Sequence, residues 1–306
     1  MTTNLQRLAL RGILLTREVV ATGVGPRQLH RSLNAQGWQR VVTGAWAAPG
    51  TELTPWLKAR AVQILHPELT LSHRGAATLH RIELLREAVE FTAPDSPTGR
   101  RHGFQVHRVP LAPGEVCVRH GLRATTPLRT LRDLLLGGPR DEALVAVDSA
   151  LGTRVVRGVR RTRLVTTDLL ALACATHPTR RHRVPRAAGW LALADPQSGS
   201  PAETVARLRM HDAGLHPVSQ ADLVAPAGRR IRADFLFVRE GVVVEIEGYA
   251  YHGSRDAHRR DLDRFNALSA CPGVRLILRF PAAAVFRSPD RMLAEIRAAL
   301  ATSVRA

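Results

Sequence analysis

The sequence contains very little lysine. Lys58 is the only one among 306 residues, so nearly all of the 44 basic side chains are arginine. With 26 acidic side chains, the formal net charge at pH 7 is +18. Such a surplus favours polyanionic partners, because each basic group that neutralises a phosphate releases condensed counterions. A biased base composition of the encoding genome would also enrich arginine, so charge alone leaves both explanations open.

Cysteines and long apolar runs are scarce as well. Cys117, Cys174 and Cys271 are far apart and form no C-x-x-C pair, which argues against a disulfide framework and a structural zinc knuckle. No apolar run approaches the ~20 residues that a membrane span needs, and arginines interrupt the first 15 residues, where a signal peptide needs an apolar core. The sequence therefore predicts a soluble, cytoplasmic protein without a membrane partner. Its length predicts at least two domains, since single cores rarely exceed ~250–300 residues.

The N-terminal segment predicts two short helices. Thr16 is placed to cap a helix that runs through Val20, and the glycines at 23 and 25 end it. Pro26 occupies a favoured first position for the second helix, in which Leu29 and Leu33 form the buried stripe. The side chains left on the outer faces of this second helix, within reach of a DNA major groove, are Arg27, His30, Arg31 and Asn34.

The segment after Gly37 predicts a hairpin. "WQRVVTGAWAA" gives two short strands around Thr43-Gly44, and Arg40 lies on the first of them. Two helices followed by such a hairpin are typical of a winged helix, in which the hairpin is the wing and DNA is the partner. The alternative is a small helical hairpin with ordinary solvated arginines.

Residues 51–153 predict a mixed α/β unit in which no catalytic group is recognised. Helical patterns occur in "PWLKARAVQIL" and in "SHRGAATLHRI", where Ser72 is a candidate N-cap. Strand patterns follow in "GFQVHRVPL" and "VCVRHGLRAT", and further helices in "TPLRTLRDLLL" and "DEALVAVDSAL".

Three stretches of this half resemble a known family. "GILLTREVVATGVGPRQLHRSLNAQGWQRVVTGAWAAPG", "LSHRGAATLHRI" and "TTPLRTLRDLL" are similar to the AbiEi-type antitoxins of bacterial abortive-infection and type IV toxin–antitoxin systems. The resemblance covers roughly residues 5–150 and rests on short, degenerate motifs. It implies a DNA-binding winged helix, a second antitoxin domain, repressor activity and a cognate toxin as a partner.

A basic segment precedes the C-terminal part. Between Arg154 and Arg186 there are nine arginines, and Asp168 is the only acid. The pattern predicts a basic connecting region, interrupted by a helix over 167–176, and its alternative is a solvated linker face. "ADPQSGSP" is predicted to separate the two halves. In "SPAETV", which follows, Ser200, Pro201 and Glu203 form a capping box, so Glu203 is either a helix cap or an acid that faces a cleft.

The stretch "RIRADFLFVREGVVVEIEGYAYHGS" predicts an antiparallel hairpin that carries three acids. With Arg239-Glu240 as a two-residue turn, Asp234 stands opposite Glu245, their Cβ atoms ~4.5–5.5 Å apart. Glu247 projects on the same face, because side chains alternate along a strand. The residues predicted on the other face are Ala233, Phe235, Phe237, Val242, Val244 and Ile246.

Three carboxylates on one face predict a cation site. Like charges at this spacing repel, a divalent cation relieves the repulsion, and an oxygen-only ligand set suits Mg²⁺ or Mn²⁺. A three-residue turn remains an alternative; it would shift the register and move Asp234 to the opposite face.

The order of acids resembles the D…(D/E)-x-K signature of restriction-endonuclease-like nucleases. More closely, "ADFLFVREGVVVEIEGYAYHGS" and "DAHRRDLDRFNALSACPGVRLILRF", within residues 200–300, resemble the very short patch repair endonuclease and its relatives. The resemblance implies that Asp234, Glu245 and Glu247 hold a metal and that His252 serves acid–base chemistry or phosphate contact. It also implies that the site is completed by Asp261, Arg264 and Arg279.

Two departures from these families stand out. Glu247 occupies the lysine position of the nuclease signature and replaces the aspartate usual in the repair enzyme, whose zinc ligands have no counterpart. Each implied residue also has a structural alternative. His252 could pack a loop, Asp261 and Arg264 could form an exposed i,i+3 pair, and Arg279 could be a surface strand residue.

The sequence thus predicts a mixed α/β protein. Its predicted parts are a winged helix (1–50), an antitoxin-like α/β domain (51–153), a basic connecting region (154–199) and a restriction-endonuclease-like α/β/α domain (200–306). The function that we expect is metal-dependent hydrolysis of DNA phosphodiester bonds, guided by the N-terminal binder. The alternatives are a non-catalytic DNA-binding repressor or antitoxin and an interaction protein partnered with a toxin. The pattern does not predict an oligomeric state.

Overall fold

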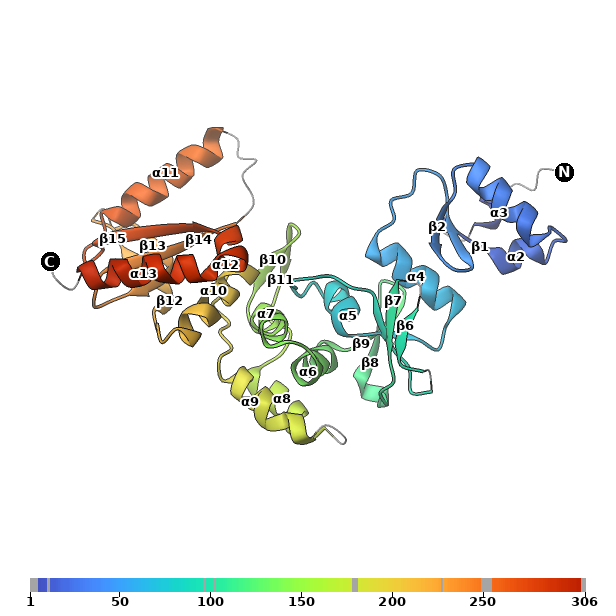
Figure 1. Cartoon of the computed structure of the whole chain (residues 1–306), viewed down its shortest axis with the longest axis horizontal. Helices are drawn as coiled ribbons and strands as arrows, with labels where there is room; N and C mark the ends of the chain where they lie inside the picture. Colours follow the sequence, from blue (N-terminus) through green and yellow to red (C-terminus); the bar gives the residue numbers. More distant parts are fainter. Residues whose placement is uncertain are drawn as a thin grey trace. The chain divides into compact units, whose positions relative to one another are not determined.

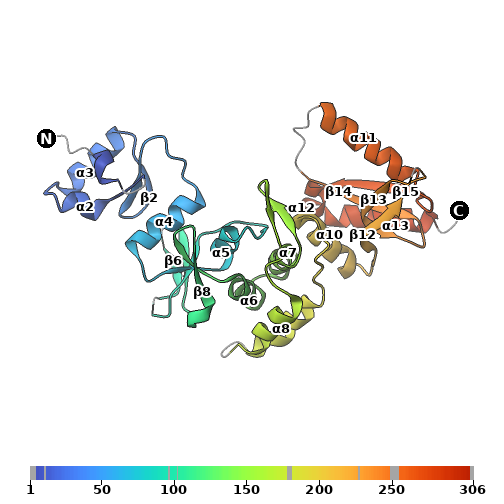
Figure 2. The ribbon, with the colours of Figure 1, turned by 180° about the vertical axis from the view of Figure 1, so that it is seen from behind.

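The computed structural model describes residues 5–9, 12–95, 97–101, 103–177, 181–226, 228–248 and 255–303. The chain is mixed α/β, as the sequence predicts, and it forms two compact units. The first comprises Met1–Arg81 with Arg86–Leu134, and the second comprises Ile82–Leu85 with Leu135–Ala306. In Figures 1 and 2 the first runs from blue to green and the second from green to red. Within the described ranges, no helix has both the length and the apolar character needed to cross a membrane.

The first unit begins with short helices and a small three-stranded sheet of order β1-β3-β2. The elements of this part are α1 (Leu5–Leu8), β1 (Ile13–Leu15), α2 (Thr16–Val20), α3 (Pro26–Ala35), β2 (Gln39–Val42) and β3 (Ala45–Ala47). The predicted order of helix, helix and hairpin is confirmed. Pro26 is the first residue of α3, and the buried Leu29 and Leu33 pack against Trp38 and Trp46.

One local expectation in this part is wrong, and one strand was missed. Thr16 does not cap α2; it is the first helical residue, and its hydroxyl accepts a hydrogen bond from the Trp46 indole nitrogen at 3.3 Å. β1 was not predicted, because three apolar residues ahead of a helical pattern carry no periodicity of their own. Ile13–Leu15 becomes a strand by pairing with β3.

The rest of the first unit is built on a six-stranded sheet of order β6-β7-β5-β4-β9-β8. Its elements are α4 (Pro55–Leu65), β4 (Thr70–Leu71), α5 (His73–Leu79), β5 (Glu90–Thr92), β6 (Gly99–Arg101), β7 (Phe104–His107), η1 (Pro113–Glu115), β8 (Val116–Arg119), β9 (Leu122–Thr125) and α6 (Pro127–Gly137), whose end lies in the second unit. Strands β5 and β7 run parallel, with Thr92 opposite His107. Ser72 occupies the N-cap position of α5, but its hydroxyl makes no capping bond and lies instead 3.0 Å from Nδ1 of His73.

The second unit starts with helices that surround an arginine-rich hairpin. The elements are α7 (Arg140–Leu151), β10 (Arg154–Val156), β11 (Val159–Arg161), α8 (Thr167–Ala175), η2 (Arg181–Arg183), α9 (Val184–Leu191) and α10 (Pro201–Asp212). Helix α7 belongs to this unit because Asp148 accepts hydrogen bonds from Thr204 and Arg207 on α10, at 2.9 and 2.7 Å. The "ADPQSGSP" loop therefore lies inside the second unit and does not separate two halves.

The basic connecting region is only partly solvated. Arg154 and Arg161 face each other across the β10–β11 hairpin, and both are buried. Arg154 donates to the carbonyl oxygens of Asp148, Pro196 and Ser198, whereas Arg161 donates to that of Ser149. These two arginines bind backbone carbonyl oxygens at the end of α7 and in the loop before α10. Their guanidinium groups therefore stabilise the fold of this unit.

The C-terminal part of the second unit has three layers, α/β/α, as expected. Its elements are β12 (Val218–Val224), β13 (Arg230–Phe237), β14 (Val242–Glu247), α11 (Arg255–Ser269), β15 (Leu276–Pro281), α12 (Ala282–Arg287) and α13 (Pro289–Ser303). The sheet order is β12-β13-β14-β15, antiparallel except for the parallel β14–β15 pair. Helix α11 covers one face, and α10, α12 and α13 cover the other (Figures 1 and 2).

The register of the β13–β14 hairpin is the one that a two-residue turn predicts. Phe235 pairs with Val244 and Phe237 with Val242, which puts Asp234 level with Glu245 and rules out the three-residue alternative. The connecting loop is Val238–Gly241, and Gly241 adopts a left-handed φ of +67°. A side chain at Gly241 would also collide with the loop before β15, since its Cβ would lie 2.3 Å from the Gly273 carbonyl oxygen.

The prediction for Ala233 is wrong. Phe235, Phe237 and the inward residues of β14 pack towards α10, α12 and α13, but Ala233 packs with Leu268 and Cys271 on the α11 side. Strict alternation would put Ala233 and Phe235 on the same face. The alternation is therefore interrupted at Asp234, where the regular pairing of β13 with β14 also ends.

Candidate functional site

The candidate acidic site lies where backbone hydrogen bonds between β13 and β14 are replaced by hydrogen bonds from the backbone to side chains. The N–H of Asp234 donates to Oε1 of Glu245 at 3.1 Å, and the N–H of Ile246 donates to Oδ2 of Asp234 at 2.8 Å. Each carboxylate thus takes the place of a backbone acceptor on the opposite strand. This exchange holds both acids at the centre of the sheet and fixes their orientation.

Glu203 is the third carboxylate beside Asp234. Both interpretations of Glu203 describe real contacts, because it lies in the first turn of α10 and also faces the acids of the sheet. Its backbone N–H bonds to the Ser200 hydroxyl at 3.2 Å, and its Oε2 accepts from the Gly199 N–H at 2.6 Å. The Gln220 amide on β12 donates to Oε2 of Glu203 at 2.7 Å and to Oδ1 of Asp234 at 3.2 Å. Gln220 therefore bridges the helix cap and the strand carboxylate.

Gln220 was missed in the sequence, although strand register offers a signal for it. The β12–β13 pairing puts Ser219 opposite Phe235 and Ala221 opposite Ala233, which leaves Gln220 level with Asp234. Gln220 has a left-handed φ of +47°, an uncommon conformation for a non-glycine residue. A predicted register of β12 against β13 would therefore have identified Gln220 as the polar side chain next to Asp234.

Burial makes this group of acids costly to ionise together. Burial and the neighbouring charges of Glu203 and Glu245 raise the pKa of Asp234 from its ordinary value near 3.8 to about 7. Burial also raises the pKa of Glu203. Arg264 on α11 supplies a compensating charge: it pairs with Oε2 of Glu245 and donates to the Arg232 carbonyl at 2.8 Å. The charge of Arg154 acts on Glu203 and lowers its pKa, yet the pKa of Asp234 stays raised.

Glu247 does not join these three acids. It pairs with Arg279 on β15, and Arg279 in turn contacts Asp261 on α11, Nη2 to Oδ2, at 2.8 Å. The guanidinium of Arg279 also lies 5.5 Å from the centre of the Phe265 ring. Asp261 contacts Arg279 on β15, and Arg264 contacts Glu245 on β14. These contacts differ from the exposed i,i+3 pair that was the alternative.

The structure thus divides the predicted site residues into two adjoining groups. Asp234, Glu245, Glu203 and Arg264 form the acidic group, and Glu247, Arg279 and Asp261 form an ion-pair chain at the next strand. His252 lies outside the described residues.

The candidate nucleic-acid interface is on the first unit. Arg27, His30, Arg31 and Asn34 are all exposed on α3. Pro26, Arg27, His30 and Arg31 line an open pocket of about 410 Å³ at the start of that helix. The His30 ring stands edge-on to Trp46 at 5.3 Å, so one side chain of this surface is fixed by the core. On β2, Arg40 is exposed and donates to the Thr43 hydroxyl at 2.8 Å.

A third group was not recognised in the sequence. His73, Glu90 and His107 lie in the first unit, and one ligand atom of each falls within 4.8 Å of the others, so the group could hold a metal ion. Among the residues that the structure describes, no other set of three or more His, Cys, Asp or Glu side chains is this close. The acids around Asp234 are therefore less tightly grouped than these three residues.

Comparison with known proteins adds no further constraint. No protein-family model matches the chain, and a search of curated proteins finds no match either.

Proposed function

We propose that this protein is a DNA-binding, metal-dependent endonuclease, with the hydrolytic site around Asp234 in its second unit. The observation that carries the proposal is the convergence of three carboxylates, of which Glu203 and Glu245 are buried and Asp234 is partly buried. Carboxylates held this close together repel one another and destabilise the fold. A bound cation would offset that repulsion, so the cluster favours a cation site. The resemblance of this segment to restriction-endonuclease-like nucleases points the same way.

The residues fit a hard divalent cation better than a soft one. Asp234, Glu245 and Glu203 offer only oxygen atoms, which suits Mg²⁺ or Mn²⁺. When bound, such an ion would stabilise charge on a phosphate and favour ionisation of a water molecule. Asp234 and Glu245 would hold it, with Glu203 as a further oxygen donor.

This chain's own residues would then orient and compensate the site. The backbone N–H groups of Asp234 and Ile246 keep the two strand carboxylates in fixed positions, so that little reorganisation accompanies binding. In the hydrolysis, a water oxygen bonds to phosphorus and gives up a proton, the bond from phosphorus to one ester oxygen breaks, and the departing ester oxygen takes up a proton. Arg264, which pairs with Glu245, would supply a positive charge to a phosphate bound next to that acid.

DNA recognition is assigned to the first unit. The exposed Arg27, Arg31 and Arg40 supply charge for phosphate contacts, whereas His30 and Asn34 offer polar groups to base edges. A helix preceding a β-hairpin is a recurrent DNA-reading arrangement. The two units would therefore divide binding and hydrolysis between them within one chain.

A specific observation also favours a second function, a non-catalytic repressor or antitoxin. Glu245 is already paired with Arg264, and Glu247 with Arg279, so salt bridges compensate these two acids without a cation. In that case the winged helix would bind an operator and the second unit would serve as a scaffold or as the contact for a toxin.

Cleavage of DNA by the purified full-length protein separates the two functions. Supercoiled plasmid and mismatched duplex would each be incubated with Mg²⁺, Mn²⁺ or a chelator. We expect metal-dependent nicking by the wild type and its loss in Glu245→Gln, because the amide keeps the shape but loses the ligand charge. Asp234→Asn serves as a second variant, and thermal melts would establish that both variants fold. Absence of cutting on every substrate, with DNA binding retained, would favour the repressor.

A further inference from the structure

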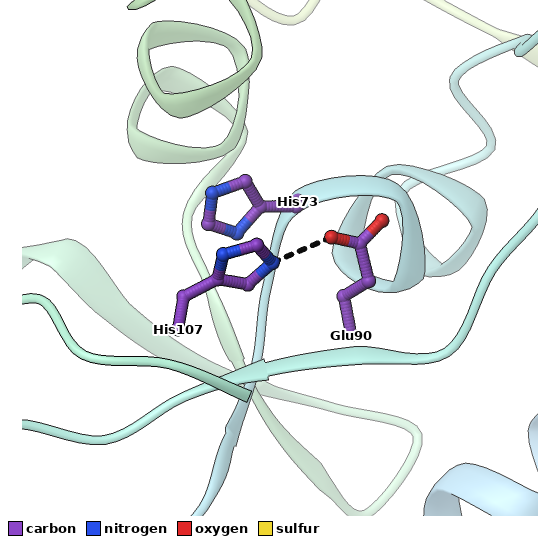
Figure 3. A group of neighbouring side chains, drawn as sticks. All are labelled: His73, Glu90 and His107. Carbon is purple, nitrogen blue, oxygen red and sulfur yellow. Dashed lines mark hydrogen bonds and ion pairs between the residues drawn. The ribbon is translucent and has the colours of Figure 1, made fainter. Parts of the chain in front are cut away.

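We propose that His73, Glu90 and His107 form a zinc site in the first unit, separate from the acidic site and independent of the proposed nuclease activity. The three residues come from α5, β5 and β7, which are distant in sequence but adjacent in the fold (Figure 3). Two imidazoles and one carboxylate are a ligand set that suits Zn²⁺, whereas Mg²⁺ and Ca²⁺ prefer oxygen alone. Three protein ligands leave a fourth position for water.

Two of the three side chains are buried, His107 is partly exposed, and a hydrogen bond and a ring stack already link the three. His73 and Glu90 are 6% and 3% exposed, and Nε2 of His107 lies 2.6 Å from Oε2 of Glu90. The His73 and His107 rings are stacked, with centroids 3.8 Å apart, as Figure 3 shows. Ligand atoms around a tetrahedral zinc ion lie about 3.3 Å apart. Binding would therefore draw the three atoms together and turn one ring out of the stack, a side-chain rotation that leaves the backbone in place.

A second set of contacts orients the three ligands, as is usual around metal ions. Arg74 binds Oε1 of Glu90, which leaves Oε2 facing His107. The Ser72 hydroxyl lies 3.0 Å from Nδ1 of His73 and accepts from the Thr92 hydroxyl at 2.8 Å.

The backbone also brings the ligands together at an energetic cost. His73 has a left-handed φ of +47°, and residues held in such conformations cluster at functional sites. Helix α5 packs so closely against β5 that any residue larger than glycine would be crowded at position 75. A Cβ there would come 3.1 Å from both the nitrogen and the carbonyl oxygen of Glu90. A zinc ion bound here would tie the start of α5 to two strands of the six-stranded sheet.

Zinc titration of the full-length, metal-stripped protein tests the site. We expect the wild type to bind Zn²⁺ and to melt at a higher temperature with Zn²⁺ than with a chelator, because a ligand that binds only the folded state stabilises it. In His107→Gln, whose amide can still donate to Glu90, the affinity for this site should fall at least tenfold. Co²⁺ added in place of Zn²⁺ should give visible absorption that reports nitrogen and oxygen ligands in the wild type but not in the variant.

Two controls identify the site. His66 lies 3.5 Å from Glu68 on the surface of the same unit, so His66→Ala removes an exposed imidazole beside a carboxylate and should leave zinc binding unchanged. Asp234→Asn alters only the acidic site and should also retain it, which distinguishes failure of this proposal from failure of the nuclease. Equal zinc affinity in the wild type and His107→Gln, or no zinc-dependent change in melting temperature, would overturn the proposal.

Discussion

Asp234 and Glu245 each bind the backbone of the other's strand: Glu245 accepts from the N–H of Asp234, and Asp234 accepts from the N–H of Ile246. The exchange holds two like-charged groups together in the middle of a sheet, where neither can move away from the other. Burial, together with the charges of Glu203 and Glu245, raises the pKa of Asp234, although the hydrogen bond from Ile246 lowers it.

Asp234→Asn should change the pH dependence of stability. With a pKa of about 7, against an ordinary value near 3.8, the folded protein holds a proton that the unfolded chain releases between these values. The free energy of unfolding therefore falls as pH rises through this window. Asparagine cannot ionise and still accepts from Ile246, so the variant should melt higher than the wild type at pH 8 in chelator, and the difference should shrink at about pH 4. Asp222→Asn, an exposed change on β12, is the control; equal pH profiles for Asp234→Asn and wild type would contradict the prediction.

Mn²⁺ titrations should separate the two groups of acids. Calorimetry with Asp234→Asn should show binding weakened at least tenfold, because a ligand charge is lost at the acidic site. Glu247→Gln should bind nearly as the wild type does, since Glu247 is paired with Arg279. The zinc site of the first unit is intact in all three proteins, so differences report the acids alone. Equal weakening in both variants would instead mean that Arg279 releases Glu247 to share the ion.

DNA affinity should depend on two arginines of α3. We expect Arg27→Ala/Arg31→Ala to weaken duplex binding and to reduce the slope of log affinity against log salt by about 1.8, because each lost phosphate contact removes about 0.9. Arg123→Ala, an equally exposed arginine on β9, is the matched control. Fluorescence anisotropy at several salt concentrations measures both quantities. An unchanged slope in the double variant would remove α3 from the interface.

Arg154→Ala should destabilise the second unit by about 2–4 kcal/mol, because it removes the donor to the buried Ser198 carbonyl oxygen in the loop before α10 and one of two donors to the Asp148 carbonyl oxygen on α7. Arg160→Ala, on the exposed side of the same hairpin, should change stability by less than about 0.5 kcal/mol. Urea denaturation followed by circular dichroism gives both values. If the two variants unfold alike, the buried guanidinium is not what holds the hairpin to α7.

The sequence by itself determined the features that depend on neighbouring residues. Pro26 at the start of α3, the Leu29 and Leu33 stripe and the register of the β13–β14 hairpin all follow from local periodicity and turn length. Because that register depends only on the turn, it puts Asp234 level with Glu245 whatever the long-range contacts are.

Only the tertiary structure decided which distant side chains meet. Glu203 and Gln220 lie beside Asp234 because α10 and β12 pack against the hairpin. Glu247 forms an ion pair with Arg279 on the parallel strand β15 and does not join that group. The group of His73, Glu90 and His107 is likewise assembled by the parallel pairing of β5 with β7 and the close approach of α5. Parallel neighbours are joined by long connections, so their register is set by the packing of the whole sheet and cannot be counted along the chain.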